Sequence, residues 1–158
     1  MSENSLQLAR VREAAESLGL RVHPRIMPDT TRTAEEAAAA CGCSVAEIVK
    51  SLVFRGAVSG TAVLLLVSGK NRVDEARVGL LIGEAIERPN AAFVRAATGF
   101  AIGGIPPLGH RTPLPTYIDE DLLAFPRVFA AAGTPHALFD IDPKALADAL
   151  GAHVIAMR

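Results

Sequence analysis

The backbone amides of a glycine- and proline-rich stretch are the first groups in this sequence that could do chemistry. Residues 98–115 hold four glycines and four prolines, interleaved with apolar side chains that can anchor the stretch to a core. Proline fixes φ and lacks a backbone donor, while glycine adopts conformations closed to other residues, so neither a regular helix nor an interior strand can form here. The N–H groups of Gly103, Gly104 and Ile105 could hold a carbonyl, a carboxylate or a phosphate. The alternative is a proline-stiffened connection that binds no ligand.

Lys50 is the second candidate, because aliphatic residues surround it in the segment 47–54. We expect the chain to pass there from a capped helix into a strand. A lysine in this position can bury its aliphatic stem and direct its ammonium group into a cleft. Alternatively, Lys50 is a surface residue that interacts with the C-terminus of the helix.

The familiar catalytic motifs do not occur in the sequence. It has no nucleophile elbow, no HExxH or other metal-ligand spacing, no Walker loop and no Rossmann fingerprint. Cys41 and Cys43 are one residue apart, so a disulfide between them would be strained, and two thiols are too few for a zinc site. Of the four histidines, His110 follows the glycine-rich loop and His136 lies in a turn. Chemistry without a metal or other cofactor, or simple binding, is what remains.

Length and composition favour one globular domain spanning residues 1–158. Half of the residues are hydrophobic and only 4% are aromatic, so the core must be aliphatic. The net charge of −1 argues against a protein that grips long stretches of nucleic-acid backbone, although it allows contact with the end of a nucleic acid. Residues 1–20 are too polar for a signal peptide and the apolar runs are too short to cross a bilayer. A cytoplasmic protein without membrane contact is expected.

Periodicity and capping signals predict short helices mixed with strands. Helices are expected at residues 5–18, 33–40, 73–81, 91–97 and 142–150, with a short helix from Ser44 to Val49 or Lys50 and a helical turn at 119–123. Strands are expected at residues 21–27, 51–55, 61–68, 84–88, 116–118, 127–131, 137–141 and 153–157. The strands 51–55 and 61–68 should form a hairpin whose second strand is buried on both faces. The predicted fold is α/β, a single compact domain with a mixed, largely antiparallel sheet surrounded by short helices.

Four segments of the sequence resemble the YbaK / prolyl-tRNA editing-domain family, which includes ProX-like aminoacyl-tRNA deacylases. Two of them carry most of the resemblance, Ile48-Val-Lys-Ser-Leu-Val53 and Gly99-Phe-Ala-Ile-Gly-Gly-Ile-Pro-Pro-Leu-Gly109. The other two are residues 31–37 and 114–119. Neither main motif is specific alone, but their order and spacing are. The resemblance covers the chain from about residue 22 to residue 150.

The resemblance implies an activity. Members of this family hydrolyse the ester of wrongly charged tRNA, commonly tRNA-Pro carrying alanine, cysteine or another small amino acid. Some are insertions in prolyl-tRNA synthetase and others are free-standing, and this chain is expected to be a free-standing hydrolase that edits in trans without a cofactor. Its expected partners are the acceptor end of mischarged tRNA-Pro and prolyl-tRNA synthetase.

The resemblance also implies roles for particular residues. The family lysine falls on Lys50, and the Gly-x-x-x-Pro loop falls on Gly103–Pro107. Lys50 would orient the tRNA terminus, since an unshifted lysine is protonated at pH 7 and suits a phosphate better than it suits the role of a free base. The loop amides around Gly104 would hold the ester and its developing oxyanion, while the 2′-OH of the terminal adenosine helps to activate water. The catalytic residues are thus Lys50 and Gly104, and the expected substrate-binding residues are Thr31, Gly103, Ile105, Pro107, His110 and His136.

The sequence departs from the cysteine-specific branch of the family at one position. An aspartate of that branch aligns with Leu138, and Asp140, two residues further on, would share its face of a strand. The departure favours alanine or a similarly small acyl group over cysteine. Two other functions stay open, a non-catalytic module of the same fold that binds aminoacyl-tRNA or prolyl-tRNA synthetase, and a thiol-redox protein that uses Cys41 and Cys43.

Overall fold

The centre of the fold is an aliphatic hairpin, as the sequence predicts. The computed structural model describes residues 3–158, so residues 1 and 2 of the predicted domain lie outside the described residues. Strands β2 (Ile48–Gly56) and β3 (Ala62–Ser68) pair in antiparallel fashion. Every residue of β3 is buried, which confirms its predicted central position. Its unbroken run of branched aliphatic residues packs against neighbours on both faces, as in strands that water does not reach.

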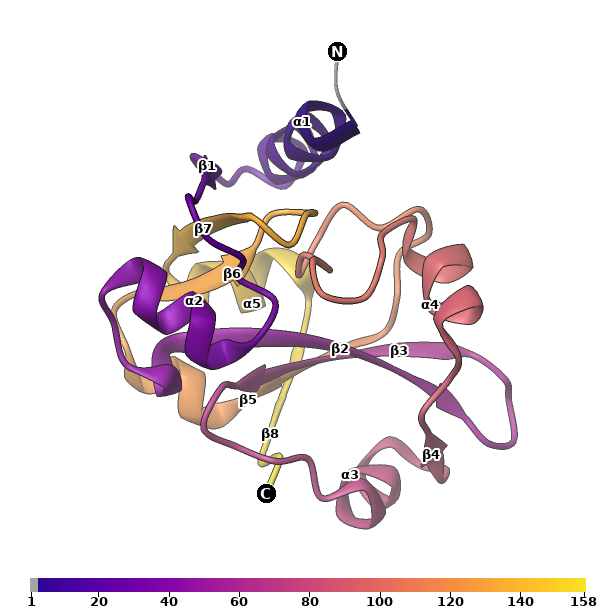
Figure 1. The fold of residues 1–158 in the computed structure, drawn as a ribbon. Helices are drawn as coiled ribbons and strands as arrows, with labels where there is room; N and C mark the ends of the chain where they lie inside the picture. Colours follow the sequence, from indigo (N-terminus) through magenta and orange to yellow (C-terminus); the bar gives the residue numbers. More distant parts are fainter. Residues whose placement is uncertain (1–2) are drawn as a thin grey trace.

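The remaining strands extend this hairpin into one mixed sheet with the order β1-β7-β6-β2-β3-β5-β8, in which β4 pairs with the far end of β2 (Figure 1). The β1–β7, β7–β6, β2–β3 and β2–β4 pairs are antiparallel, whereas the β2–β6, β3–β5 and β5–β8 pairs are parallel. This arrangement confirms the predicted mixed, largely antiparallel sheet. The other strands are β1 (Arg25–Ile26), β4 (Ile86–Glu87), β5 (Thr116–Asp119), β6 (Val128–Ala131), β7 (Ala137–Ile141) and β8 (His153–Ile155).

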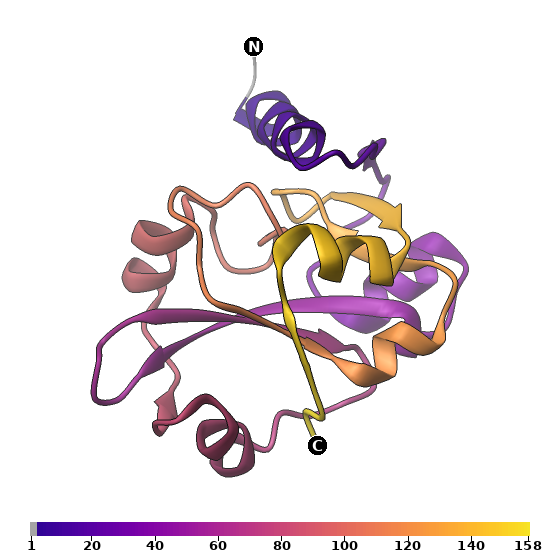
Figure 2. The same ribbon diagram turned by 180° about the vertical axis from the view of Figure 1, so that it is seen from behind.

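Short helices cover both faces of the sheet. They are α1 (Glu3–Ser17), α2 (Ala34–Cys41), α3 (Glu75–Ile82), α4 (Ala91–Thr98) and α5 (Pro143–Leu150), with 3-10 turns η1 (Val45–Glu47) and η2 (Glu120–Ala124). Figure 1 shows α1 lying across β7 and the loop after α4, with α3 at the opposite end of the molecule. The view from behind shows α5 in front of the sheet (Figure 2). None of the helices within residues 3–158 is long and apolar enough to span a bilayer.

The hydrophobic core is divided by the sheet. One cluster contains Val11 of α1, Val94 of α4 and Leu146 of α5, together with Phe100 from the loop after α4. A second cluster on the other face contains Val78 of α3. A third, smaller cluster joins the alanines of α2 to Ile48 and Leu138. The loop after α4 is therefore part of the main core and is not a flexible connection.

One predicted boundary near the candidate lysine is wrong. The helix expected to run from Ser44 to Val49 or Lys50 is a 3-10 turn that ends at Glu47, and the strand already begins at Ile48. The Glu47 side chain accepts a hydrogen bond from the backbone N–H of Ser44 at 3.0 Å, so the start signal is real. The next two residues are β-branched and pair with β6, which favours the strand over a longer helix. The strands predicted at 21–27, 84–88 and 153–157 are also shorter than expected.

Candidate active site

A cavity of about 400 Å³ lies where β2 loses its neighbour on one edge. β6 pairs with β2 only at Ile48 and Val49, and β4 pairs with it only at Arg55 and Gly56. The residues of β2 between these two pairings line the cavity. The opposite wall comes from the loop after α4, and the start of α2 closes one side. The sheet therefore holds this site open by leaving a gap between two short strands.

Lys50 lies in the middle of the strand wall and lines the cavity, half-buried. Its Nζ donates a hydrogen bond to the backbone carbonyl of Asn71 at 2.5 Å. The Asn71 side chain in turn donates to the carboxylates of Asp119 and Asp121, each at 2.8 Å. Burial lowers the pKa of Lys50 below its ordinary value, and the carboxylates of Glu35 and Asp119 oppose this shift. A partly desolvated ammonium group attracts an anion more strongly than one in bulk water does.

The loop after α4 contributes Gly103 and Ile105 to the cavity wall. Gly103 has φ of 101°, a conformation that side chains rarely allow. Gly104 is held against the turn before β7, where an added Cβ would lie only 2.6 Å from the carbonyl carbon of Thr134. Its N–H donates to the carbonyl of Ala101 at 3.3 Å and so closes a turn inside the loop. The glycines thus let the main chain pack tightly behind the cavity.

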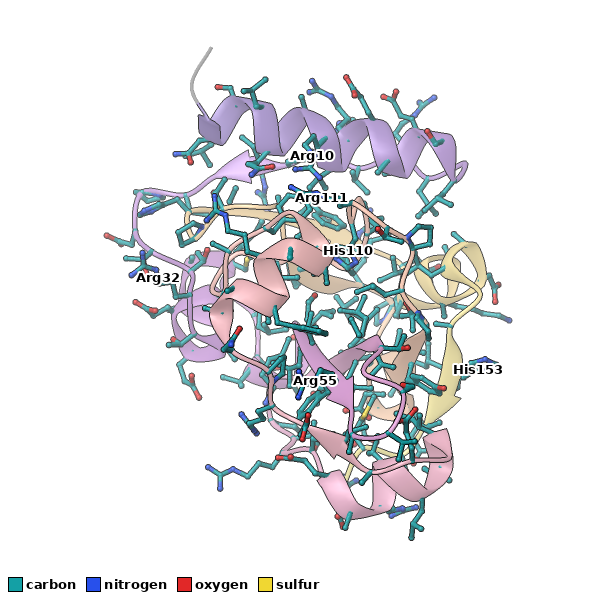
Figure 3. The ribbon with its side chains drawn as sticks, turned by 90° about the vertical axis from the view of Figure 1, so that its right-hand side faces the viewer. Arg10, Arg32, Arg55, His110, Arg111 and His153 are labelled. Atoms are coloured by element: carbon teal, nitrogen blue, oxygen red, sulfur yellow. The ribbon has the colours of Figure 1, made fainter. Side chains whose placement is uncertain are left out.

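Side chains outside the cavity support the loop from behind. The Arg10 guanidinium of α1 donates to the carbonyls of Gly99 and Gly109, at 3.5 and 3.4 Å, and lies 4.5 Å from the centre of the Phe100 ring. The His110 ring is hydrogen-bonded to the carbonyl of Pro106 at 2.6 Å. Figure 3 shows Arg10 between α1 and the loop that carries His110. Burial lowers the pKa of His110, and the Pro106 carbonyl only partly offsets this effect.

The segment before α2 forms a third, more polar side of the cavity. Thr31 is buried, and both its N–H and its hydroxyl donate to the carbonyl of Pro135, at 2.7 and 3.1 Å. Thr33 accepts a hydrogen bond from the N–H of Glu36 and begins α2. Arg32 lies against Gly103 across the cavity mouth, and Arg88 lines the cavity from beyond β4. The rim is therefore cationic although the whole chain has a net charge of −1.

The structure brings together half of the residues predicted for the site. Lys50, Thr31, Gly103 and Ile105 line the cavity, although they come from three separate parts of the sequence. The other four predicted residues, Gly104, Pro107, His110 and His136, do not line it. Gly104 supports the loop, and His110 binds Pro106 behind it. The backbone N–H of His136 is also engaged outside the cavity, because it donates to the hydroxyl of Thr134 at 3.2 Å. Direct substrate contacts by these four residues stay predictions.

Other lining residues were not predicted from the sequence. The polar ones are Arg32, Thr33, Ser51 and Arg88, and Val53 is among the apolar ones. Ser51 and Val53 belong to the segment that carries Lys50, but sequence alone does not reveal which edge of a strand stays unpaired. Arg88 looks like an ordinary surface arginine, and its Nε lies 3.2 Å from a carboxylate oxygen of Glu75. The signals that pointed to this strand were the run of apolar residues around a lysine and the family motif at residues 48–53.

Comparison with known proteins agrees with the fold. A family profile described as an aminoacyl-tRNA editing domain matches residues 28–149. The chain is thus of the aminoacyl-tRNA deacylase class, which confirms the class of enzyme predicted from the motifs. The chain belongs to the aminoacyl-tRNA editing domain family.

Individual relatives support the same assignment. A solved structure of a candidate trans-editing enzyme for prolyl-tRNA synthetase is 48% identical, with a TM-score of 0.91 over 100% of this chain and 98% of that chain. YwhH of Bacillus subtilis, an uncharacterised protein, is 32% identical over 120 residues, 75% of each chain. EbsC of Enterococcus faecalis, a candidate Cys-tRNA(Pro)/Cys-tRNA(Cys) deacylase, is 26% identical over 72% of this chain and 70% of that protein. The close structural match confirms the predicted α/β fold.

Proposed function

We propose that the protein is a trans-editing hydrolase that deacylates mischarged tRNA-Pro carrying alanine or another small amino acid. The observation that carries the proposal is that Lys50, Gly103 and Ile105 line one cavity of about 400 Å³. This volume lies within the range of sites for small ligands. The cationic rim suits the phosphates of a tRNA acceptor end. Prolyl-tRNA synthetase is the proposed protein partner, and the expected cytoplasmic location follows from this function.

The proposed reaction needs a positioned water molecule and a site for negative charge. The water oxygen bonds to the ester carbonyl carbon, the bond from that carbon to the ribose oxygen breaks, and a proton from water passes to the ribose oxygen. The N–H groups of Gly103 and Ile105 donate to the carbonyl oxygen as it becomes negative in the transition state. Lys50 binds the terminal phosphate and orients the ester, and the ribose 2′-OH assists the attacking water. The turn formed by Gly104 keeps the donors in place.

The proposed preference for alanine rests on Leu138. This side chain lines the cavity and is 2% exposed, so it presents an apolar surface where the cysteine-specific branch has an aspartate. Asp140 instead forms an ion pair with Arg127 at 2.9 Å. An apolar wall offers a thiol no hydrogen-bond partner, so it removes the advantage that cysteine would gain from a carboxylate there. Discrimination between such small side chains by a hydrophobic pocket is on the order of 10–200-fold.

Hydrolysis of a panel of charged tRNAs tests the proposal directly. Purified protein is incubated with tRNA-Pro charged with alanine, cysteine, serine or proline, and release of the amino acid is measured against buffer. Alanine should be released fastest, and correctly charged prolyl-tRNA should stay intact. If no ester is hydrolysed faster than in buffer, but the protein binds the charged tRNA tightly, the non-catalytic binding module is the correct function.

A further inference from the structure

The outer edge of β2 exposes main-chain groups to the cavity. Gly56 donates to the carbonyl of Thr61 at 2.9 Å, and Gly69 donates to the carbonyl of Ile48 at 2.8 Å. Hydrogen-bonded and non-hydrogen-bonded pairs alternate along an antiparallel ladder, so the even-numbered residues of β2 bond to β3. The odd-numbered residues therefore direct their N–H and C=O groups towards the opposite edge.

The two ends of this edge are paired and the middle is not. Val49 faces Ala130 of β6, and Arg55 faces Glu87 of β4. Ser51 and Val53 lie between these pairings, and no strand within residues 3–158 pairs with them on this side. Both residues line the cavity. Their outward main-chain groups thus have no strand partner within residues 3–158 and face the cavity, where a ligand can bind them.

Ser51 provides a second, independent observation. Its Oγ is buried and has no hydrogen-bond partner among the described residues. Burying an unpaired hydroxyl destabilises a folded protein, and most buried polar atoms do have partners. A ligand that donates hydrogen bonds at this position would satisfy both the Oγ and the outward carbonyl of the same residue. The two oxygens belong to one residue, so they suit a small group with several N–H donors.

We propose that Ser51 binds the α-amino group of the aminoacyl ester, through its Oγ and its backbone carbonyl oxygen. The identity of the ligand rests on the proposed deacylase function. The α-amino group of an alanyl ester carries two or three N–H donors, enough to satisfy both oxygens. Successive side chains of a strand point to opposite faces, so Lys50 and the Ser51 hydroxyl do not compete for one position. The ester carbonyl then faces the loop amides across the cavity.

The test compares two substrates and three forms of the protein. The substrates are alanyl-tRNA-Pro and propionyl-tRNA-Pro, in which a hydrogen atom replaces the amino group. Ser51→Ala should lower kcat/KM for the alanyl ester about tenfold, the effect of losing about 1.4 kcal/mol, and should leave the propionyl ester unchanged. Ser51→Thr keeps the hydroxyl and should retain most of the difference between the substrates. An equal loss on both esters, or no loss on either, would overturn the proposal.

Thermal stability gives an independent readout. Because the Oγ lacks a partner, the Tm of Ser51→Ala should equal or exceed that of the wild type. Ser68→Ala is the matched control, since the buried Oγ of this β3 serine donates to the carbonyl of Ala46 at 2.7 Å. Its Tm should fall, while its ratio of activities on the two esters should stay that of the wild type. A lower Tm for Ser51→Ala would mean that the hydroxyl has a structural partner, and the proposal would be wrong.

A stable analogue separates failure of this inference from failure of the proposed function. In 3′-alanylamino-3′-deoxyadenosine an amide replaces the ester, so binding is measured without turnover. Ser51→Ala should bind this analogue about tenfold more weakly than the wild type, the same 1.4 kcal/mol difference. If the wild type hydrolyses no ester but shows this difference, the function fails and the subsite stands. If it hydrolyses the esters and both proteins bind the analogue equally, the subsite fails and the function stands.

Discussion

The two walls of the cavity are built in different ways. The strand wall at β2 is fixed by its ladder with β3, so its main chain depends little on the side chains that face the cavity. The loop wall has no such ladder. It is held by contacts on its far side, from Arg10 to the carbonyls of Gly99 and Gly109 and from Gly104 to the backbone of Thr134.

This difference determines what a substitution can reveal. On the strand wall, a side chain can be removed while the main chain stays in place, so activity should change without loss of stability. On the loop wall, the functional groups are backbone amides, which no substitution removes cleanly. A change there acts by displacing the main chain, and activity and stability should fall together. The following predictions test this separation from the largest expected effect to the smallest.

The strand wall should show the largest effect, at Lys50. Lys50→Ala should lower kcat/KM for alanyl-tRNA-Pro about 100-fold, because removing one electrostatic contact to a transition state typically costs this much. Its Tm should change little, since the ammonium group is only half-buried. Lys70 is an exposed lysine just after β3, and Lys70→Ala is the control, which should keep full activity. A fully active Lys50→Ala variant would remove this residue from the mechanism.

The loop wall should respond differently at Gly104. In Gly104→Ala, the new methyl group would collide with the Thr134 backbone, at a cost of about 1–3 kcal/mol in stability, and the displaced amides should lower kcat/KM about tenfold. Gly60→Ala is a matched control in the β2–β3 turn, where φ is 71° and no atom lies within 4 Å. Backbone strain there should cost roughly 1–2 kcal/mol and leave activity intact. Equal kcat/KM values for the two variants would show that the position of the loop main chain does not affect catalysis.

Support of the loop by α1 is tested at Arg10. Arg10→Ala loses the two hydrogen bonds to the loop carbonyls, a third to the side chain of Gln7 within α1, and the contact with the Phe100 ring, which should lower stability by about 1 kcal/mol and raise KM about threefold. The control is Arg12, an exposed arginine two residues further along α1. The free energy of unfolding of Arg12→Ala should stay within about 0.5 kcal/mol of that of the wild type. Unfolding by urea and steady-state kinetics measure both effects. An unchanged KM with reduced stability would mean that α1 supports the core and not the site.

The two walls also differ in how far they could be predicted from the sequence. The strands and helices could be predicted because their signals are local. The unbroken aliphatic run at 62–68 forms β3, and the glycines at 42 and 151 end α2 and α5. The motifs predicted Lys50 and the Gly103–Pro107 loop as parts of one site. They could not give the gap in the sheet, because the lengths of β4 and β6 depend on tertiary packing. Ser51 escaped notice for that reason.

Position within the loop was equally hard to predict. Gly103 and Gly104 are identical in type and adjacent, yet one lines the cavity and the other is packed behind it. The difference depends on the Thr134 turn, 30 residues further along the chain, and no local pattern encodes that contact. His110 likewise follows the loop in sequence but turns its ring back to Pro106. In a segment without regular periodicity, sequence order does not predict which side faces a ligand.

The smallest effect should be the pH dependence of the loop wall, through His110. Burial lowers its pKa below the ordinary 6.5, so in acid the unfolded chain takes up a proton that the folded loop resists. Stability should therefore be fully present above about pH 7 and should fall as the pH drops through 6.5. His110→Gln can still donate to Pro106 but does not titrate, so its Tm should decline less between pH 7.5 and pH 5 than that of the wild type. Parallel Tm profiles would show that the pH response arises elsewhere, and the loop wall would then be as insensitive to protonation as the strand wall.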